Sequence, residues 1–287
     1  MKKLKRASAL VLVFSCLWAM LAFAVPTSAA QGYDFPEGSV PVSVTLDGKR
    51  ILEGEAVIIN SVTYVPLRAF SELMGADSIN WNAKTNTATV KKGTLSIFLT
   101  SGALYVGANG RYFFTVEKIL NINDRLFVPV RAIAGAFNAS VDWNGSTRTV
   151  VLTSSKKTLV SGDEFYNSTD LYWLSRIISA EASGETLVGQ IAVGNVVLNR
   201  KASKQYPNTV YGVIFDRKGG TQFTPVVSGT IYNKPSSASV IAAKICLEGY
   251  TVDSGILFFM NPRIATSNWI SKNRPFAFSL GNHDFYY

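Results

Sequence analysis

A stretch that occurs twice decides the first half of the chain. Tyr64-Val65-Pro66-Leu67-Arg68-Ala69-Phe70 returns 63 residues later as Phe127-Val128-Pro129-Val130-Arg131-Ala132-Ile133. Each copy is followed by a short helix-like stretch, at residues 71–75 and 134–137. Similarity at a fixed offset is the signature of two copies of one structural unit. The sequence therefore predicts a duplicated module.

Each copy continues with a tryptophan-containing strand and a strand rich in Thr and Val. These predicted strands are residues 79–82 and 87–90 in the first copy and 141–144 and 147–151 in the second. Alternating apolar residues and β-branched residues mark them as strands, and Asn-rich segments between them supply turns. Pro66 and Pro129 suit a helix start or a strand edge, where no amide donor is needed. We expect a β-rich, duplicated βαβ-type module.

This half resembles the copper amine oxidase N-terminal-like module of secreted bacterial proteins, over roughly residues 40–153. The copper is not expected to transfer, because residues 31–164 contain no His and no Cys. We therefore expect a binding or spacing module with no cofactor. Arg68 and Arg131 recur at matching positions and have two open interpretations. Each forms an ion pair within its repeat, or each contacts a wall polymer directly.

Residues 1–30 read as a secretory signal. Four basic residues precede an apolar run from Ala7 to Val25, and Ser28-Ala29-Ala30 follows Pro26. This order of features predicts export with cleavage near Ala30. The alternative is an uncleaved membrane anchor, because the run is about long enough to span a bilayer. We expect no membrane contact once the signal is removed.

The composition and charge limit which classes of partner are expected. The chain has 287 residues and a formal charge of +9, and it is 47% hydrophobic and 16% charged, which excludes wholesale disorder. Residues 31–164 hold 13 basic and 12 acidic residues, and residues 165–287 hold 11 and 7. The basic surplus of the second half suits an anionic cell wall. Nucleic acid is not an expected partner, since no basic cluster or recognition motif is present.

A single glutamate stands on the apolar face of a predicted helix in the second half. At 100° per residue, Glu181 falls on the same stripe as Leu171, Leu174 and Ile178. Burial disfavours a charged carboxylate, so the pKa of Glu181 should rise. A carboxylic acid that stays protonated near neutral pH is what glycosidic cleavage needs as a general acid. The alternative is that the helix ends before Glu181 and the side chain turns to solvent.

Other polar residues nearby have two interpretations each. Glu185 is a second carboxylate or an acid in the first turn of the next helix. Asn195 and Asn199 are satisfied core amides or sugar-binding amides. Downstream, aromatic residues stand beside amides in several short clusters, which suits a sugar-chain groove. The candidate substrate-binding residues are Gln222, Phe223, Asn261, Trp269, His283 and Tyr286.

The second half resembles the SleB-type cell wall hydrolases, the spore-cortex-lytic enzymes and their vegetative relatives, over about residues 170–287. The residues that carry the resemblance are Ala180–Glu185, Gly189–Arg200, Tyr206–Val210, Gln222-Phe223, Asn261-Pro262 and Gly281–Phe285. The resemblance implies a mainly helical, lysozyme-like domain with a small β part. It also implies lytic transglycosylase cleavage between N-acetylmuramic acid and N-acetylglucosamine, with Glu181 as the catalytic acid and the peptidoglycan glycan strand as partner.

These observations together predict an α+β chain of two domains. The expected divisions are a signal at 1–30, the duplicated module at 40–153, a linker at 154–167 and the hydrolase domain at 168–287. The spore enzymes of this family carry a different N-terminal domain, so wall turnover stands beside spore cortex lysis as a role. We expect a secreted protein that is extracellular, or associated with the cell wall or spore. Oligomeric state is left open.

Rival functions find little support in the residues present. A zinc amidase needs several His, Asp or Cys ligands, and the chain has one His, so no metal site is expected. A Cys–His peptidase would need Cys246, which lies in an apolar helical run and reads as a buried small hydrophobe. Two alternatives stay open: an inactive wall-binding protein, and a muramidase that uses water.

Overall fold

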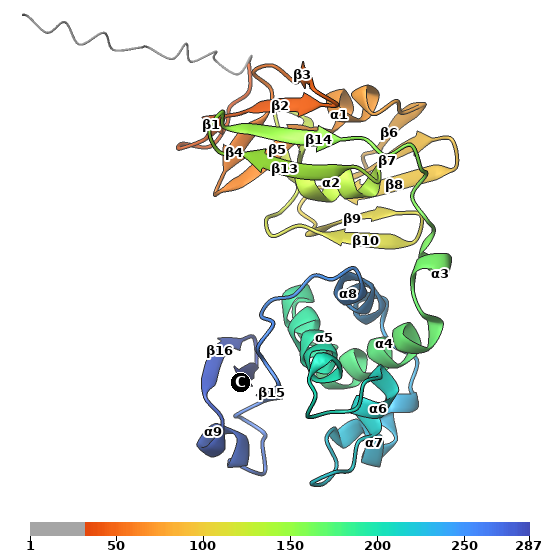
Figure 1. Cartoon of the computed structure of the whole chain (residues 1–287), viewed down its shortest axis with the longest axis vertical. Coiled ribbons are helices and arrows are strands. Elements are labelled where there is room, and N and C mark those ends of the chain that lie inside the picture. Colours follow the sequence, from red (N-terminus) through yellow and green to blue (C-terminus); the bar gives the residue numbers. More distant parts are fainter. Residues whose placement is uncertain (1–31) are drawn as a thin grey trace, which may run out of the picture.

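The computed structural model describes residues 32–287 as a mixed α/β structure (Figure 1). A β-rich half comes first, and a mainly helical half with one small sheet follows. The secretory signal predicted at residues 1–30 lies outside the described residues. Within residues 32–287, no helix combines the length and apolar character needed to cross a membrane.

Two hairpins, one from each repeat, pair at the centre of the first sheet. Its strands in spatial order are β1 (Val40–Pro41), β4 (Val57–Ile59), β5 (Val62–Pro66), β12 (Arg125–Pro129) and β11 (Leu120–Ile122). Val65 on β5 pairs with its repeat equivalent, Val128 on β12, in an antiparallel ladder. The two hairpin turns are built alike. Asn60-Ser61 and Asn123-Asp124 all have positive φ, as a two-residue type I′ turn requires.

A short helix follows each central strand. Helix α1 (Leu67–Leu73) begins after Pro66 and helix α2 (Val130–Ala136) begins after Pro129. Each proline therefore occupies the predicted helix start, whereas the strand that it closes is central in the sheet and not at its edge. Phe70 on α1 and its equivalent Ile133 on α2 are fully buried in one continuous core of this half.

Two further sheets complete the β-rich half. One contains, in spatial order, β10 (Arg111–Phe114), β9 (Tyr105–Ala108), β8 (Leu95–Thr100), β7 (Thr87–Lys92) and β6 (Ser78–Asn82). The other contains β13 (Ser140–Asn144), β14 (Thr149–Thr153), β2 (Ser43–Leu46) and β3 (Lys49–Ile51). The repeats diverge here, because β7 continues into a meander whereas β14 pairs in parallel with the early strand β2.

In the second half, the other helices pack around α5. Its helices are α3 (Gly162–Phe165), α4 (Ser168–Ala182), α5 (Leu187–Ala202), α6 (Val210–Phe215), α7 (Thr224–Ser228), the 3-10 helix η1 (Thr230–Tyr232), α8 (Ser237–Leu247) and α9 (Trp269–Asn273). A small sheet has the order β15 (Phe258–Met260), β17 (His283–Tyr286) and β16 (Phe276–Leu280). Leu174, Ile191 and Ile245 join α4, α5 and α8 in one apolar cluster.

The segment predicted as a linker, residues 154–167, packs against both halves. Leu159 is buried in the core of the β-rich half, and α3 lies within the segment. The Tyr166 hydroxyl donates to the Glu248 carboxylate of the second half at 2.6 Å. Polar composition alone predicts exposure, whereas the buried side chains of Leu159 and Tyr166 anchor this segment to the two halves.

Candidate active site

Helix α4 carries Glu181 as its penultimate residue. The helix begins where the Asn167 side chain accepts a hydrogen bond from the Asp170 amide at 3.0 Å. Leu174 and Ile178 on the predicted stripe are fully buried. Because the helix continues to Ala182, the alternative in which it ends before Glu181 is wrong.

The Glu181 carboxyl group is partly buried, and burial is the cause that raises its pKa to about 7. Its neighbour Ala182 belongs to an apolar cluster with Ile256 and Phe285, so the end of α4 packs beside the small sheet. A carboxyl group with this pKa is largely protonated just below neutral pH and ionised just above it. It therefore suits a group that first gives and then takes a proton.

The second carboxylate, Glu185, has a different environment. It accepts hydrogen bonds from the Asn282 backbone amide at 3.3 Å and from the Asn282 side-chain amide at 2.8 Å. The His283 Nδ1 atom lies 3.6 Å from its Oε1 atom. Gly281 lies with Asn282 in the β16–β17 turn and has φ +61°, and a Cβ atom there would overlap the Glu185 carboxylate. Only glycine fits, so Glu185 binds the β16–β17 turn to the start of α5.

Glu185 does not cap α5, contrary to one of the two interpretations above. Thr186 is the capping residue, because its hydroxyl accepts from the Gly189 amide at 3.3 Å. His283 is also enclosed here, with 7% of its surface exposed. Burial lowers the pKa of His283, and the nearby Glu185 and Asp284 carboxylates partly oppose that effect. The imidazole is therefore mainly neutral near pH 7.

Comparison with known proteins matches both halves of the chain to families. Residues 184–286 match the family described as Cell Wall Hydrolase, and residues 45–159 match the family described as Copper amine oxidase N-terminal domain. The catalytic domain of the germination-specific lytic transglycosylase SleB from Bacillus anthracis is 35% identical, with a TM-score of 0.39. The match covers 45% of this chain and 100% of that structure.

The second half of the chain therefore contains a cell wall hydrolase domain. The spore cortex-lytic enzyme of Bacillus cereus is 37% identical over 120 residues, which are 42% of this chain and 45% of that protein. The spore cortex-lytic enzyme of Bacillus subtilis is 36% identical over 120 residues, 38% of that protein. The chain thus spans less than half the length of these relatives. Glu181 lies three residues before the segment that matches the family.

The predicted substrate-binding residues of the cell wall hydrolase domain fall into two groups. Asn261, Trp269, His283 and Tyr286 lie on or beside the small sheet, and Gln222 and Phe223 lie at the start of α7. Phe259 on β15 joins the groups, because its ring centroid is 6.3 Å from that of Phe223 and 5.4 Å from that of His283. Trp269 is 51% exposed.

The burial of Phe223 argues against direct stacking on a sugar. Only 3% of its surface is exposed, and the Arg200 guanidinium lies 5.2 Å from its ring centroid. Gln222 is also engaged, since its amide donates to the Lys218 carbonyl at 3.1 Å. An isolated sequence cluster does not show on which side of a turn the ring will be enclosed. Tyr286 and His283 are also buried, because their strand, β17, is the central strand of its sheet.

The asparagines of α5 are satisfied core amides. Asn195 donates to the Tyr250 carbonyl at 3.0 Å and accepts from the Val252 amide at 2.8 Å. Asn199 donates to the carbonyls of Asp253 and Ile256 at 3.0 and 2.9 Å. These bonds hold the irregular segment before β15 against the helix, so their role is structural.

Sequence reasoning missed the position of Arg200. Its side chain is 5% exposed, its Nε atom donates to the Leu257 carbonyl at 2.7 Å, and its guanidinium lies 5.2 Å from the centroid of the Tyr206 ring. Arg200 therefore fixes β15 relative to α5. The position of an arginine at the end of a helix gives no sign of such burial, because basic residues are common there for electrostatic reasons.

The described part of the chain contains no cluster of metal-ligating side chains and no accessible thiol. Among residues 32–287, no three or more His, Cys, Asp or Glu side chains gather closely enough to hold a metal ion. Cys246 is 2% exposed, and burial raises the pKa of its thiol. The interpretation of Cys246 as a buried small hydrophobe agrees with this burial.

Proposed function

We propose that this chain cleaves the glycan strands of peptidoglycan, as a lytic transglycosylase acting between N-acetylmuramic acid and N-acetylglucosamine. The observation that carries the proposal is the Glu181 carboxyl group, whose pKa burial raises to about 7 at the border of a cell wall hydrolase domain. The substrate class is supported by the relatives, which are named as spore cortex-lytic enzymes and as a germination-specific lytic transglycosylase.

In the proposed reaction, Glu181 acts first as an acid and then as a base. Its proton passes to the oxygen that leaves as the 4-hydroxyl of N-acetylglucosamine, and the bond from that oxygen to C1 of N-acetylmuramic acid breaks. The 6-hydroxyl of the muramic acid then bonds to C1 and gives its proton to the Glu181 carboxylate. The product has a 1,6-anhydro ring, and the carboxylic acid is restored for another cycle.

The environment of Glu185 supports a mechanism with one working carboxylate. A retaining glycosidase needs a second carboxylate free to attack the sugar. Glu185 is instead held by three hydrogen-bond contacts from Asn282 and lies beside His283. We therefore assign Glu185 the structural task of positioning the β16–β17 turn. Attack by the sugar's own hydroxyl requires no second carboxylate.

The groups proposed to bind substrate are those with exposed polar or aromatic surface near the small sheet. Trp269 offers an exposed ring, and a cavity of about 530 Å³ is lined in part by Met260, Asn268 and Tyr286, although not by Asn261. Glu181 lines neither this cavity nor the three hollows of the β-rich half. Gln222 and His283 are proposed to hold these surfaces in place, since both are engaged with protein partners.

The wider assignments belong to the same proposal. We propose a lysozyme-like fold for residues 168–287, the duplicated module at 40–153, and the joining segment at 154–167. The chain is proposed to be exported and to act outside the cell, in wall turnover or on the spore cortex. The expected partner is the glycan strand, and no cofactor is required by the reaction as written.

The Glu181→Gln variant tests the proposed function. The wild-type chain is expected to clear a suspension of peptidoglycan, and the variant is expected to bind the polymer without clearing it. Mass spectrometry of the released fragments then separates the chemistries. Anhydro ends support the transglycosylase, reducing ends assign a muramidase that uses water, and binding without clearing by the wild type assigns a wall-binding protein.

A further inference from the structure

The β-rich half contains two hollows in equivalent positions of its two repeats. The first, the Trp81 groove, has a volume of about 540 Å³ and lies between the start of α1, strand β6 and the β11–β12 turn. The second, the Trp143 groove, has a volume of about 690 Å³ and lies between the start of α2, strand β13 and the β4–β5 turn. Each groove uses the turn of the other repeat, so the β5–β12 pairing creates both.

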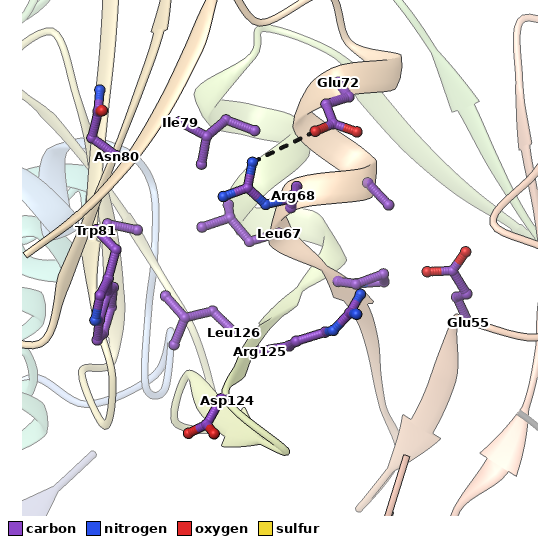
Figure 2. A pocket seen from close by; sticks show the side chains of 13 residues that line it. Glu55, Leu67, Arg68, Glu72, Ile79, Asn80, Trp81, Asp124, Arg125 and Leu126 are labelled. Atoms are coloured by element: carbon purple, nitrogen blue, oxygen red, sulfur yellow. Dashed lines mark ion pairs between the residues drawn. The ribbon is translucent and has the colours of Figure 1, made fainter. Parts of the chain in front are cut away.

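The equivalent side chains in the two grooves are of the same kinds. Trp81 and Trp143 are 46% and 45% exposed, so both repeats present a large flat ring to solvent at the same place. Exposed Arg68 and Arg131 line the respective grooves. Figure 2 shows Trp81 on one side of its groove with Arg68 and Leu126 across from it.

The arginines have different neighbours although they are equivalent. Arg68 lies 3.7 Å from Glu72 in an exposed ion pair, whereas Arg131 donates to the Val141 carbonyl at 3.4 Å, and Gly135 stands where Glu72 does. The interpretation of a structural ion pair in each repeat therefore holds for the first repeat alone. An ion pair of this exposure contributes little to stability, which leaves the shared Arg–Trp arrangement without a structural explanation.

The chemistry of the grooves fits an uncharged sugar chain. A flat indole face suits the apolar face of a pyranose ring, and guanidinium and amide groups suit its hydroxyl and acetamido groups. The Trp81 groove is lined by two arginines and three carboxylates, and the Trp143 groove by Arg131 and Asp142. Because the charges nearly cancel in each groove, a polyanion is not favoured as a ligand.

We propose that the two grooves are glycan-binding subsites that hold the chain on the polymer cleaved by its cell wall hydrolase domain. The ligand class rests on the proposed function. The Trp143 groove is also lined by Phe114 and Tyr250, whose ring centroids are 4.1 Å apart across the two halves. Since Asn195 of α5 holds the Tyr250 carbonyl, this groove adjoins the hydrolase domain directly.

Two subsites on one body bind a polymer more tightly than one. Once the first groove is occupied, the second meets the same strand at a high effective concentration. Loss of one indole removes the flat apolar contact of one groove and is expected to weaken binding about 3- to 10-fold, which corresponds to about 0.7–1.4 kcal/mol. Loss of both is expected to weaken it by more than about 30-fold, because the second contact is then removed as well.

The test uses the full chain with Glu181→Gln, so that the polymer is not consumed. Sedimentation with insoluble peptidoglycan gives the affinity of this parent and of its Trp81→Ala, Trp143→Ala and doubly substituted derivatives. Trp81→Tyr with Trp143→Tyr keeps a flat ring at both positions and should retain binding. Trp81→Leu with Trp143→Leu keeps apolar bulk without a flat face and should lose binding. This Leu variant serves as a second folded variant if the Ala substitutions disturb the module. Thermal unfolding reports whether each variant is folded.

Two outcomes would overturn the inference. One is a folded double Ala or Leu variant that binds as tightly as the parent. The other is competition by soluble polyphosphate but not by an N-acetylglucosamine hexamer. Clearing of peptidoglycan by the chain with Glu181 intact is scored separately. If the chain clears the polymer and the tryptophans prove irrelevant, the proposed function stands and the grooves do not. If the chain binds through the tryptophans without clearing the polymer, the grooves stand and the proposed function does not.

Discussion

Two carboxyl groups four residues apart, Glu181 and Glu185, have different neighbours in this protein. Glu181 lies on the stripe of α4 that faces the apolar core, and burial raises its pKa to about 7. Glu185 lies beyond the end of the helix and accepts hydrogen bonds from Asn282. Burial disfavours the charged form of a carboxyl group, which is why the pKa of Glu181 is raised. The chain thus places a carboxyl group of raised pKa and a hydrogen-bonded carboxylate four residues apart.

The rate of glycan cleavage should depend on pH through Glu181. The acid must be protonated to act, so kcat/KM is expected to be level below about pH 7 and to fall about tenfold per pH unit above it. Measurement of fragment release from soluble glycan strands between pH 5 and 9 checks this. A profile that stays flat to pH 9 would show that Glu181 is not the acid.

Replacement of Glu181 by Gln should stabilise the folded protein at alkaline pH. The folded-state pKa of about 7 exceeds the ordinary value of 4.5, so the folded wild type binds more protons between these values. Its free energy of unfolding therefore falls as pH rises through this window and is level above it. At pH 8 the variant is expected to be more stable by on the order of 1–3 kcal/mol, and the gain should disappear near pH 4.

Chemical denaturation at pH 4 and pH 8 measures this difference. Glu164→Gln is a matched control, because Glu164 is exposed in α3 and the same substitution there should change stability little at either pH. Equal effects of Glu181→Gln at the two pH values would contradict the assignment of a buried, neutral acid.

At the scale of elements, α5 is the helix against which the hydrolase domain is assembled. Its Asn195 and Asn199 hold the segment before β15, and its Arg200 fixes β15 itself. Close approach of neighbouring helices depends on Gly194. A Cβ atom there would lie 2.7 Å from the Cys246 Sγ atom on α8 and 2.8 Å from the Ile178 Cδ1 atom on α4.

Gly194→Ala should therefore destabilise the hydrolase domain, although Ala is the better helix former. Overpacking of this kind costs about 1–3 kcal/mol, which exceeds the gain of about 1 kcal/mol in helix propensity. Denaturant unfolding followed by circular dichroism measures the change. Gly184→Ala is the control, because nothing lies within 4 Å of a Cβ atom at that position. Addition of Cys246→Ala should recover part of the loss, and purely additive costs would argue against a clash with the sulfur.

At the scale of the whole molecule, the two halves are joined by an ion pair that lies beside aromatic side chains. Arg111 of β10 binds Glu248 through two hydrogen bonds of 2.8 and 2.6 Å, and Tyr166 donates to the same carboxylate. The Arg111 and Glu248 side chains are 12% and 8% exposed. The Arg111 guanidinium also lies 3.5 Å from the Phe165 ring centroid. This contact holds β10 against the C-terminal end of α8 and so keeps the Trp143 groove beside the hydrolase domain.

Arg111→Ala should uncouple the two halves. Removal of one partner leaves Glu248 buried with a single donor, which costs about 3–5 kcal/mol. Calorimetry is expected to resolve separate transitions of the two halves in the variant and closer transitions in the wild type. The double substitution Arg111→Met with Glu248→Gln leaves no buried charge and should recover much of the coupling. A single variant that unfolds as the wild type does would show that the contact contributes little.

The sequence by itself determined the features that repeat or follow a period. The doubled Val-Pro-x-Arg-Ala stretch predicted two equivalent strand–helix units, because one local pattern folds alike twice. Helical periodicity placed Glu181 on the apolar stripe of α4, because the 100° step is a property of the backbone. The family resemblance, which depends on linked motifs, correctly predicted a cell wall hydrolase domain.

Tertiary structure alone decided what depends on partners far away in the chain. Phe223 is buried beside Phe259 of β15, and Tyr286 is buried because its strand, β17, lies between β15 and β16. Arg200 is enclosed by segments some tens of residues downstream. The two grooves need the turn of one repeat to meet the helix of the other, which the β5–β12 pairing brings about. Burial and cavity shape are sums over such long-range contacts, whereas local patterns report the conformation of one segment.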